Sequence, residues 1–224
     1  MSEFLRVLEN EVQIAALLFL AAVYTVRLAW LFRFRSRKER ASAEGRAGAG
    51  IGRSLLNIAR PRDAESSRTK PGLYAQFVVF HVGVAAAIAA TFVIPYAPGI
   101  LESRAVVLLF QVPIGAALLV ALMRLVRRLR NPALRAVSTP DDYASLVLMI
   151  LFFAAGVIAV PNDFRRSEAP LIAFFSLTAF FLVYVPFSKI GHYLYYPFTH
   201  FFLGRTMGRR GVLPARRRAE GETP

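Results

Sequence analysis

Residues 73–95 read LYAQFVVFHVGVAAAIAATFVIP, and this stretch decides the fold. It contains no Asp, Glu, Lys or Arg, and its apolar residues form a continuous run instead of alternating with polar ones. A helix that crosses the hydrocarbon of a bilayer needs roughly 20 mostly apolar residues. The stretch therefore predicts a membrane-spanning helix, and it contains one histidine, His81.

Four further segments have the same character, at about 12–32, 105–123, 143–160 and 170–202. None alternates with a period of two, which excludes a transmembrane barrel. The sequence predicts an all-α integral membrane protein with five transmembrane helices. Residues 1–203 form one membrane domain that includes a long basic loop at 33–72, and residues 204–224 form a basic tail.

The composition supports this class. Of 224 residues, 56% are hydrophobic and 19% are charged, whereas a soluble domain is about 45–50% apolar and about 25% charged. The net charge of +14 is gathered in tracts between apolar runs, which argues against a nucleic-acid partner. The chain has no cysteine, so it cannot form disulfides, attach a c-type haem or hold an iron–sulfur cluster through thiolates.

The basic residues predict the orientation. Eleven lie between the first and second segments, five follow the third segment and six lie in the tail. Cytoplasmic loops carry an excess of Lys and Arg. The N-terminus is therefore predicted outside and the C-terminus in the cytoplasm, in a multi-pass protein of the bacterial cytoplasmic membrane.

Two features of the long loop have alternative interpretations. Ile51, Leu55, Leu56 and Ile58 are spaced for one amphipathic turn at the membrane interface, but a solvated loop beside anionic lipid headgroups fits as well. The run GAGIG at 48–52 lacks the strand and the spacing of a dinucleotide-binding motif, so that interpretation is discarded.

Ionisable residues inside apolar segments are candidate functional sites because they are costly in hydrocarbon. His81 comes about eight residues into the second segment, or roughly 12 Å along a helix. His192 comes 22 residues after Pro170, or roughly 33 Å along a continuous helix, near the same membrane face. Two imidazoles at matching depth can ligate one b-type haem. The alternative is a structural role, in which each histidine bonds a neighbouring helix.

Small and basic residues accompany these histidines. Gly83, Ala85, Ala86, Ala87 and Gly191 would allow a flat macrocycle to approach, or would pack helices together. Three cations near the same face are candidates to pair with haem propionates, and they could instead extend to the membrane interface: Lys189, Arg124 and Arg27.

Two motifs resemble those of a known family. Phe80-His81-Val82-Gly83 in the second segment, with VPFSKIGH at 185–192, is similar to the membrane cytochrome b subunit of respiratory nitrate reductase. It is also similar to the related cytochromes of sulfite-reductase-associated and heterodisulfide-reductase-type complexes. The similarity covers the five-helix body and not the long first loop.

The resemblance implies which residues bind haem. In that family four histidines on the second and fifth helices hold two haems, and His81 and His192 match the pair at the cytoplasmic side. The positions of the other pair are occupied by Thr91 and Phe174, which are not normal haem ligands. The chain thus resembles a one-haem version, which puts the family's quinol site beside the outer haem in doubt. His200 is a fallback ligand if His192 points away, or an interfacial histidine with no special role.

The expected function is that of a membrane-anchoring haem b subunit of a respiratory oxidoreductase. It would have no bond chemistry of its own. Its partners would be quinone or quinol, membrane lipid, a cytoplasmic-side iron–sulfur subunit and a catalytic subunit, and the arginine-rich face would attract an acidic partner. Quinone could bind near the remaining haem, among the polar residues Tyr74, Asp142, Tyr143 and Lys189.

Two other classes remain open. The first is a haemless anchor of a multisubunit oxidoreductase. The second is a small transporter, which the sequence disfavours because it has no internal repeat, no carboxylate within the apolar segments and no pair of broken helices.

Overall fold

The computed structural model describes residues 1–33, 43–59 and 69–214, and every regular element in these ranges is helical. Residues 34–42, 60–68 and 215–224, which hold much of the predicted basic loop and tail, lie outside the described residues. Five helices are long and apolar enough to cross a membrane: Glu3–Arg33, Pro71–Tyr96, Arg104–Arg130, Pro140–Ala159 and Ala169–Phe187. The all-helical fold and its five apolar helices are confirmed, and the orientation of the termini stays a prediction.

The chain divides into two compact units. Residues 1–31 and 75–190 form the first, which we call the bundle unit, and residues 32–74 and 191–224 form the second, which we call the hairpin unit. The bundle unit contains most of the apolar helices. Its elements are α1 (Glu3–Val7), η1 (Leu8–Val12), most of α2 (Gln13–Arg33) and of α5 (Pro71–Tyr96), η3 (Pro98–Glu102), α6 (Arg104–Arg130), α7 (Pro132–Ala136), α8 (Pro140–Ala159) and α9 (Ala169–Tyr184).

Several helices of the bundle unit begin where the sequence carries start signals. α8 begins at Pro140, which fits the first helical position because its missing N–H has no partner to lose. Thr139 and Asp142 form a capping box around that start. Helix boundaries at this end of the unit are therefore encoded locally.

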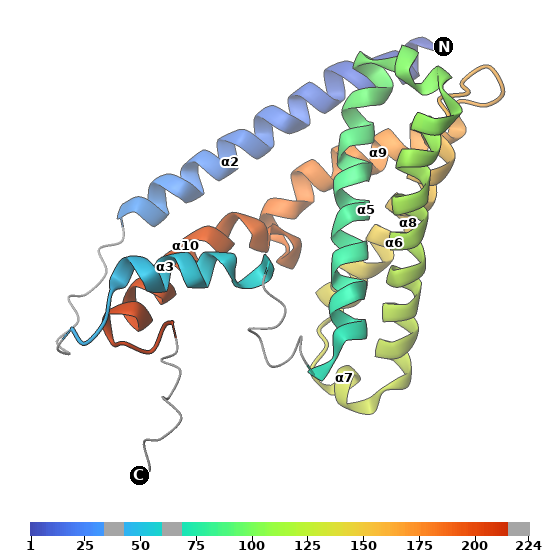
Figure 1. Ribbon diagram of the computed structural model, residues 1–224. Helices are drawn as coiled ribbons and strands as arrows, with labels where there is room; N and C mark the ends of the chain where they lie inside the picture. Colours follow the sequence, from blue (N-terminus) through green and yellow to red (C-terminus); the bar gives the residue numbers. More distant parts are fainter. Residues whose placement is uncertain (34–42, 60–68, 215–224) are drawn as a thin grey trace. The chain divides into compact units, whose positions relative to one another are not determined.

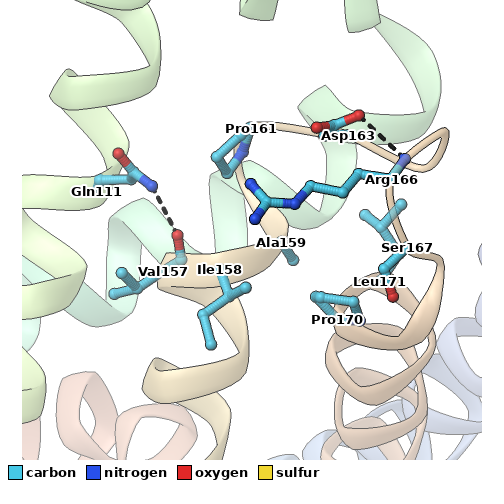
Figure 2. Close-up of a pocket in the computed structure, with 10 residues that line it drawn as sticks. All are labelled: Gln111, Val157, Ile158, Ala159, Pro161, Asp163, Arg166, Ser167, Pro170 and Leu171. Carbon is cyan, nitrogen blue, oxygen red and sulfur yellow. Dashed lines mark hydrogen bonds between the residues drawn. The ribbon is translucent and has the colours of Figure 1, made fainter.

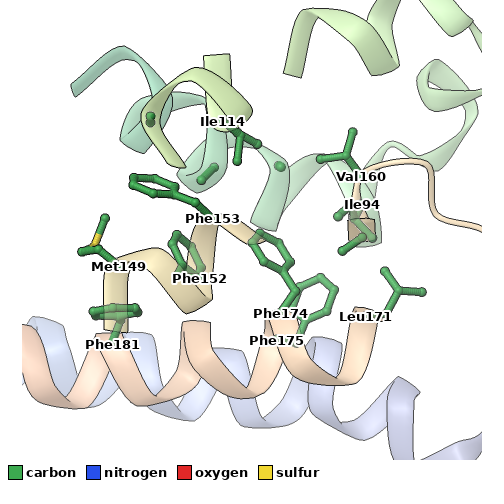
Figure 3. Close-up of a cluster of buried hydrophobic side chains, with 14 of the residues drawn as sticks. Ile94, Ile114, Met149, Phe152, Phe153, Val160, Leu171, Phe174, Phe175 and Phe181 are labelled. Atoms are coloured by element: carbon green, nitrogen blue, oxygen red, sulfur yellow. The ribbon is translucent and has the colours of Figure 1, made fainter. Parts of the chain in front are cut away.

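An aromatic core holds α8 and α9 together (Figure 3). Phe152 stacks on Phe174 with ring centroids 5.1 Å apart and an interplanar angle of 15°. Phe174 is completely buried. A Cβ at Gly156 would lie 3.1 Å from the Phe174 ring, so the absence of a side chain there lets α9 approach α8. The core is built mainly from large rings on these two helices, with smaller residues of α5 and α6 around them.

The predicted fifth segment, 170–202, is not one helix. α9 ends at Tyr184, two 3₁₀ turns follow as η4 (Val185–Phe187) and η5 (Lys189–Gly191), and α10 (His192–Arg209) begins anew. Pro186 has no N–H for the helix, and Ser188 has an extended backbone with φ −104° and ψ 171°. The rise of 33 Å applies to a continuous helix, so the depth of His192 in the membrane stays a prediction.

The hairpin unit is built on α3 (Ala47–Leu55), followed by η2 (Leu56–Ala59), and on α10. α3 and α10 lie side by side (Figure 1). A Cβ on Gly204 would lie 2.6 Å from the Gly50 carbonyl oxygen, and one on Gly208 would lie 2.8 Å from the Arg46 carbonyl oxygen. Glycine is required at both positions because the two backbones touch. The GAGIG run lies in α3, and its Gly50 belongs to this helix-packing contact. Whether the predicted amphipathic turn lies at the membrane interface stays a prediction.

Candidate functional site

His81 is the candidate haem ligand that belongs to the bundle unit. Its side chain is exposed on α5, and its Nδ1 lies 2.8 Å from the carbonyl oxygen of Phe77, one turn earlier. A carbonyl oxygen only accepts, so Nδ1 carries the hydrogen, and in the neutral ring Nε2 then has the lone pair. Histidines that ligate a metal usually donate their second ring N–H in this way. The arrangement suits coordination through Nε2.

The face of α5 that carries His81 is open and partly lined by small residues. Ala85 and Ala89, four and eight residues after His81, are exposed and share its helical face. Gly83 and Ala87 are buried instead, and a Cβ on Gly83 would lie 2.6 Å from the carbonyl oxygen of Pro113 on α6. The predicted small residues thus have different roles. Gly83 packs against α6, whereas Ala85 leaves room beside the imidazole.

Arg124, one of the predicted propionate partners, is linked to His81 through the ring of Phe80. Its guanidinium carbon stands 4.7 Å from the centroid of the Phe80 ring, and the Phe80 and His81 rings are 5.8 Å apart in an edge-to-face arrangement. No ion pair joins Arg124 to a carboxylate within the described ranges. A half-buried cation of this kind favours an anionic group beside the imidazole.

The other two predicted propionate partners are engaged elsewhere in the bundle unit. Lys189 donates to both carboxylate oxygens of Asp142 at 3.0 Å and to the Thr139 hydroxyl at 2.8 Å. Arg27 lies 5.4 Å over the ring of Phe187. An acid already neutralises Lys189, so of the three cations Arg124 is best suited to pair with a further anion.

His192 and His200 both belong to the hairpin unit, whereas His81 belongs to the bundle unit. His192 is the first residue of α10 and its side chain is exposed. Nδ1 of His200 lies 2.9 Å from the Ser54 hydroxyl on α3, and its ring lies 4.2 Å from the ring of Tyr196. His200 thus links α10 to α3, and the pairing of His81 with His192 stays a prediction.

Thr91 and Phe174, at the positions of the family's second haem pair, have structural contacts. The Thr91 hydroxyl donates to the carbonyl oxygen of Ile88 at 2.7 Å, and Phe174 fills the aromatic core. Tight packing around Phe174 leaves no space for a macrocycle at that position.

Only some of the polar residues predicted to bind quinone lie close together. Asp142 bonds Lys189 and lies 3.7 Å from Nη1 of Arg128, and Arg128 in turn stands 5.9 Å from the Tyr143 ring centroid. Tyr74 belongs to the hairpin unit. A neighbouring bond runs from the Tyr184 hydroxyl to Asp141 at 2.6 Å. The bundle unit therefore carries a charged network at the start of α8, and its groups largely satisfy one another.

A cavity of about 510 Å³ lies at the other end of the bundle unit, where α8 ends and α9 begins (Figure 2). Gln111 donates to the Val157 carbonyl oxygen at 2.7 Å, and Arg166 and Ser167 also line the cavity. None of its lining residues is a predicted haem or quinone ligand.

One buried acid was missed by the sequence reasoning. Glu9, predicted to precede the first span, lies in the π-helical turn η1 and is only 5% exposed. An apolar-segment search starts after it, at residue 12, and the only sequence signal for its burial is the flanking Leu5 and Leu8. The first apolar helix extends over Glu3–Arg33 and so includes Glu9, although Glu9 precedes the predicted segment 12–32.

The described ranges contain no cluster of three or more His, Cys, Asp or Glu residues able to hold a metal ion by themselves. A two-imidazole haem site needs no such cluster. No protein-family model and no curated protein matches the chain. The case for a function thus depends on the residues themselves.

Proposed function

We propose that the protein is a membrane-anchoring haem b subunit of a respiratory oxidoreductase. In this role it relays electrons between the quinone pool and an iron–sulfur partner. The proposal depends above all on one observation, the hydrogen bond between Nδ1 of His81 and the Phe77 carbonyl oxygen at 2.8 Å. That bond fixes the ring orientation and the tautomer, and it presents Nε2 as a ligand at an open helix face.

The residues have distinct tasks in this proposal. His81 supplies one axial nitrogen, and His192 supplies the other. Ala85 and Ala89 have small side chains on the helix face beside His81, so that a flat ring system can lie against this face. Arg124, held on the Phe80 ring, offers its charge to a propionate. A bound b-type haem would supply one-electron exchange, and the axial ligands and nearby charges would tune its potential.

The partner side follows from the positive-inside rule. The arginine-rich end of α6 lies six residues beyond Arg124, and it would face the cytoplasm. An iron–sulfur subunit with an acidic surface would therefore dock at the end of the bundle nearer to His81. The packing of Phe174 supports a single haem, because the second site of the resembled family would fall in the aromatic core.

Haem quantification on the purified full-length chain tests the proposal. We expect one haem per chain in a pyridine haemochrome assay, and loss of that haem in His81→Ala and in His192→Ala. His200→Ala is the matched control on α10, because its Nδ1 is bonded to Ser54, and it should retain haem.

Other outcomes would refute the proposal in distinct ways. A chain that binds no haem, although it is folded and inserted in the membrane, would identify a haemless anchor. Loss of haem in His200→Ala with retention in His192→Ala would transfer the second axial position to His200. Two haems per chain would contradict the roles assigned to Thr91 and Phe174.

A further inference from the structure

Glu9 and Gln13 form a pair of buried polar residues in the first apolar helix. Their side chains are 5% and 6% exposed. They are four residues apart, across the π-helical turn η1, so they lie on adjacent turns of one helix face. Single π turns occur frequently at functional sites.

The orientation of the Gln13 amide is fixed by its donors. Nε2 donates to the Phe175 carbonyl oxygen on α9 at 2.9 Å and to the Leu8 carbonyl oxygen at 3.1 Å. Turning the amide over would place Oε1 against two carbonyl oxygens, which only accept. Oε1 of Gln13 must therefore point away from both, and it has no hydrogen-bond donor in the described structure.

Glu9, like Gln13, has a buried oxygen without a hydrogen-bond donor. Its Oε1 is buried without a donor, and no salt bridge joins it to a cation in the described part of the chain. A buried carboxylate oxygen without a donor is costly, and so is an unsatisfied amide oxygen. A hydrogen atom on the Glu9 carboxyl would remove the unpaired charge, and Oε1 of Gln13, one turn further along the same face, would accept a hydrogen bond from it.

We propose that Glu9 and Gln13 form a buried proton-binding site in the first apolar helix. The ligand is a single proton, carried as the acid form of Glu9 at neutral pH and accepted in a hydrogen bond by Oε1 of Gln13. This site is separate from the predicted haem site, and its existence does not depend on haem.

The surroundings supply an exchange route. Glu168, the residue before α9, interacts electrostatically with Glu9. Its side chain is 24% exposed and lies 3.7 Å from the N-terminal ammonium group of Met1. On the segment of Glu9 itself, Glu3, Arg6 and Glu11 are exposed. Glu168 accepts a hydrogen bond from the Ser2 backbone N–H at 2.5 Å, and Ser167 beside it lines the cavity of Figure 2. Protons would pass between Glu9 and solvent by way of Glu168.

Infrared spectroscopy of the full-length protein in lipid tests the site directly. We expect the C=O band of a protonated carboxylic acid at neutral pH. The band should be lost in Glu9→Gln, retained in the matched control Glu11→Gln, and shifted in Gln13→Met, which keeps side-chain length but removes the acceptor. Hydrogen–deuterium exchange of this acid should be slower in Glu168→Gln than in the unaltered protein.

Either of two results would overturn the proposal. The spectrum could contain only ionised carboxylates at neutral pH, or the protonated band could survive in Glu9→Gln. Exchange unaffected by Glu168→Gln would refute the route through Glu168. Haem content measured on the same samples separates these outcomes from failure of the haem proposal, since Glu9→Gln should leave it unchanged.

Discussion

The rings of Phe152 and Phe174 stack 5.1 Å apart with an angle of 15° between their planes, and this contact joins α8 to α9. Phe174→Ala should destabilise the protein by about 3–5 kcal/mol, because it removes a completely buried ring and leaves a cavity in a tightly packed core. Thermal unfolding in detergent or lipid measures the loss. The matched control is Phe180→Ala on the same helix, whose side chain is 46% exposed, and similar losses for both variants would contradict the packing described here.

The second prediction concerns the glycines at the contact between α3 and α10. Gly50→Ala and Gly204→Ala should each separate the two helices, at a cost of about 1–3 kcal/mol, because an added methyl group meets backbone atoms of the partner. Gly48→Ala is the control in α3, since nothing lies within 4 Å of a Cβ there, and its higher helix propensity should make it neutral or stabilising by up to about 1 kcal/mol. Hydrogen exchange of residues 47–55 measures the effect, and equal protection in all three variants would refute the close approach.

Arg124 and Lys189 should differ in their influence on a bound haem. Arg124→Gln should lower its midpoint potential by an amount on the order of tens of millivolts, because it removes an unpaired positive charge that stabilises the reduced form. Lys189→Gln should change the potential less, because Asp142 already neutralises that ammonium group. Redox titration of both variants decides the matter, and a larger effect of Lys189→Gln would exclude the assigned role of Arg124.

The acid Glu168 makes the N-terminal segment sensitive to pH. Hydrogen bonds from the side chain and the backbone of Ser2 hold the pKa of Glu168 below its usual range. A lowered folded-state pKa means that the stabilising contribution is present above the unfolded-state pKa and is lost as the pH falls through the folded-state pKa. Hydrogen exchange of residues 2–8 should therefore increase on acidification below the ordinary range of a glutamate.

Glu168→Gln should abolish that acid-dependent step, since an amide does not titrate. Asp163→Asn is the control, because Asp163 contacts the nearby Arg166 backbone and not the N-terminal segment. Persistence of the same step in Glu168→Gln would assign it to another group.

Continuous apolar runs were the part of the fold that sequence could predict. The helix around His81 begins at Pro71 and ends at Tyr96, close to the predicted range 73–95. The run from Pro170 was less reliable, because apolarity continues through 185–191 while Pro186 and the extended Ser188 end the helix. Hydropathy measures transfer to hydrocarbon and does not register where a backbone changes direction.

Close contacts between distant residues were beyond sequence reasoning. Gly50 was considered only as part of a nucleotide motif, because its partner Gly204 lies more than 150 residues away. Glu9 was assigned to the polar flank of a span, because its burial depends on the packing of η1 against α9. His81 could be identified because an ionisable side chain in an apolar run is visible in one dimension, but its bond to Phe77 required the structure.

Replacement of the His81 ring tests the central claim most directly. His81→Gly in the full-length protein should lose the low-spin optical spectrum of a bis-imidazole haem, and added free imidazole should restore it by occupying the vacated axial position. His200→Gly should keep that spectrum without imidazole. A low-spin spectrum that is unchanged in His81→Gly would contradict the account, because the iron would then be held by other residues.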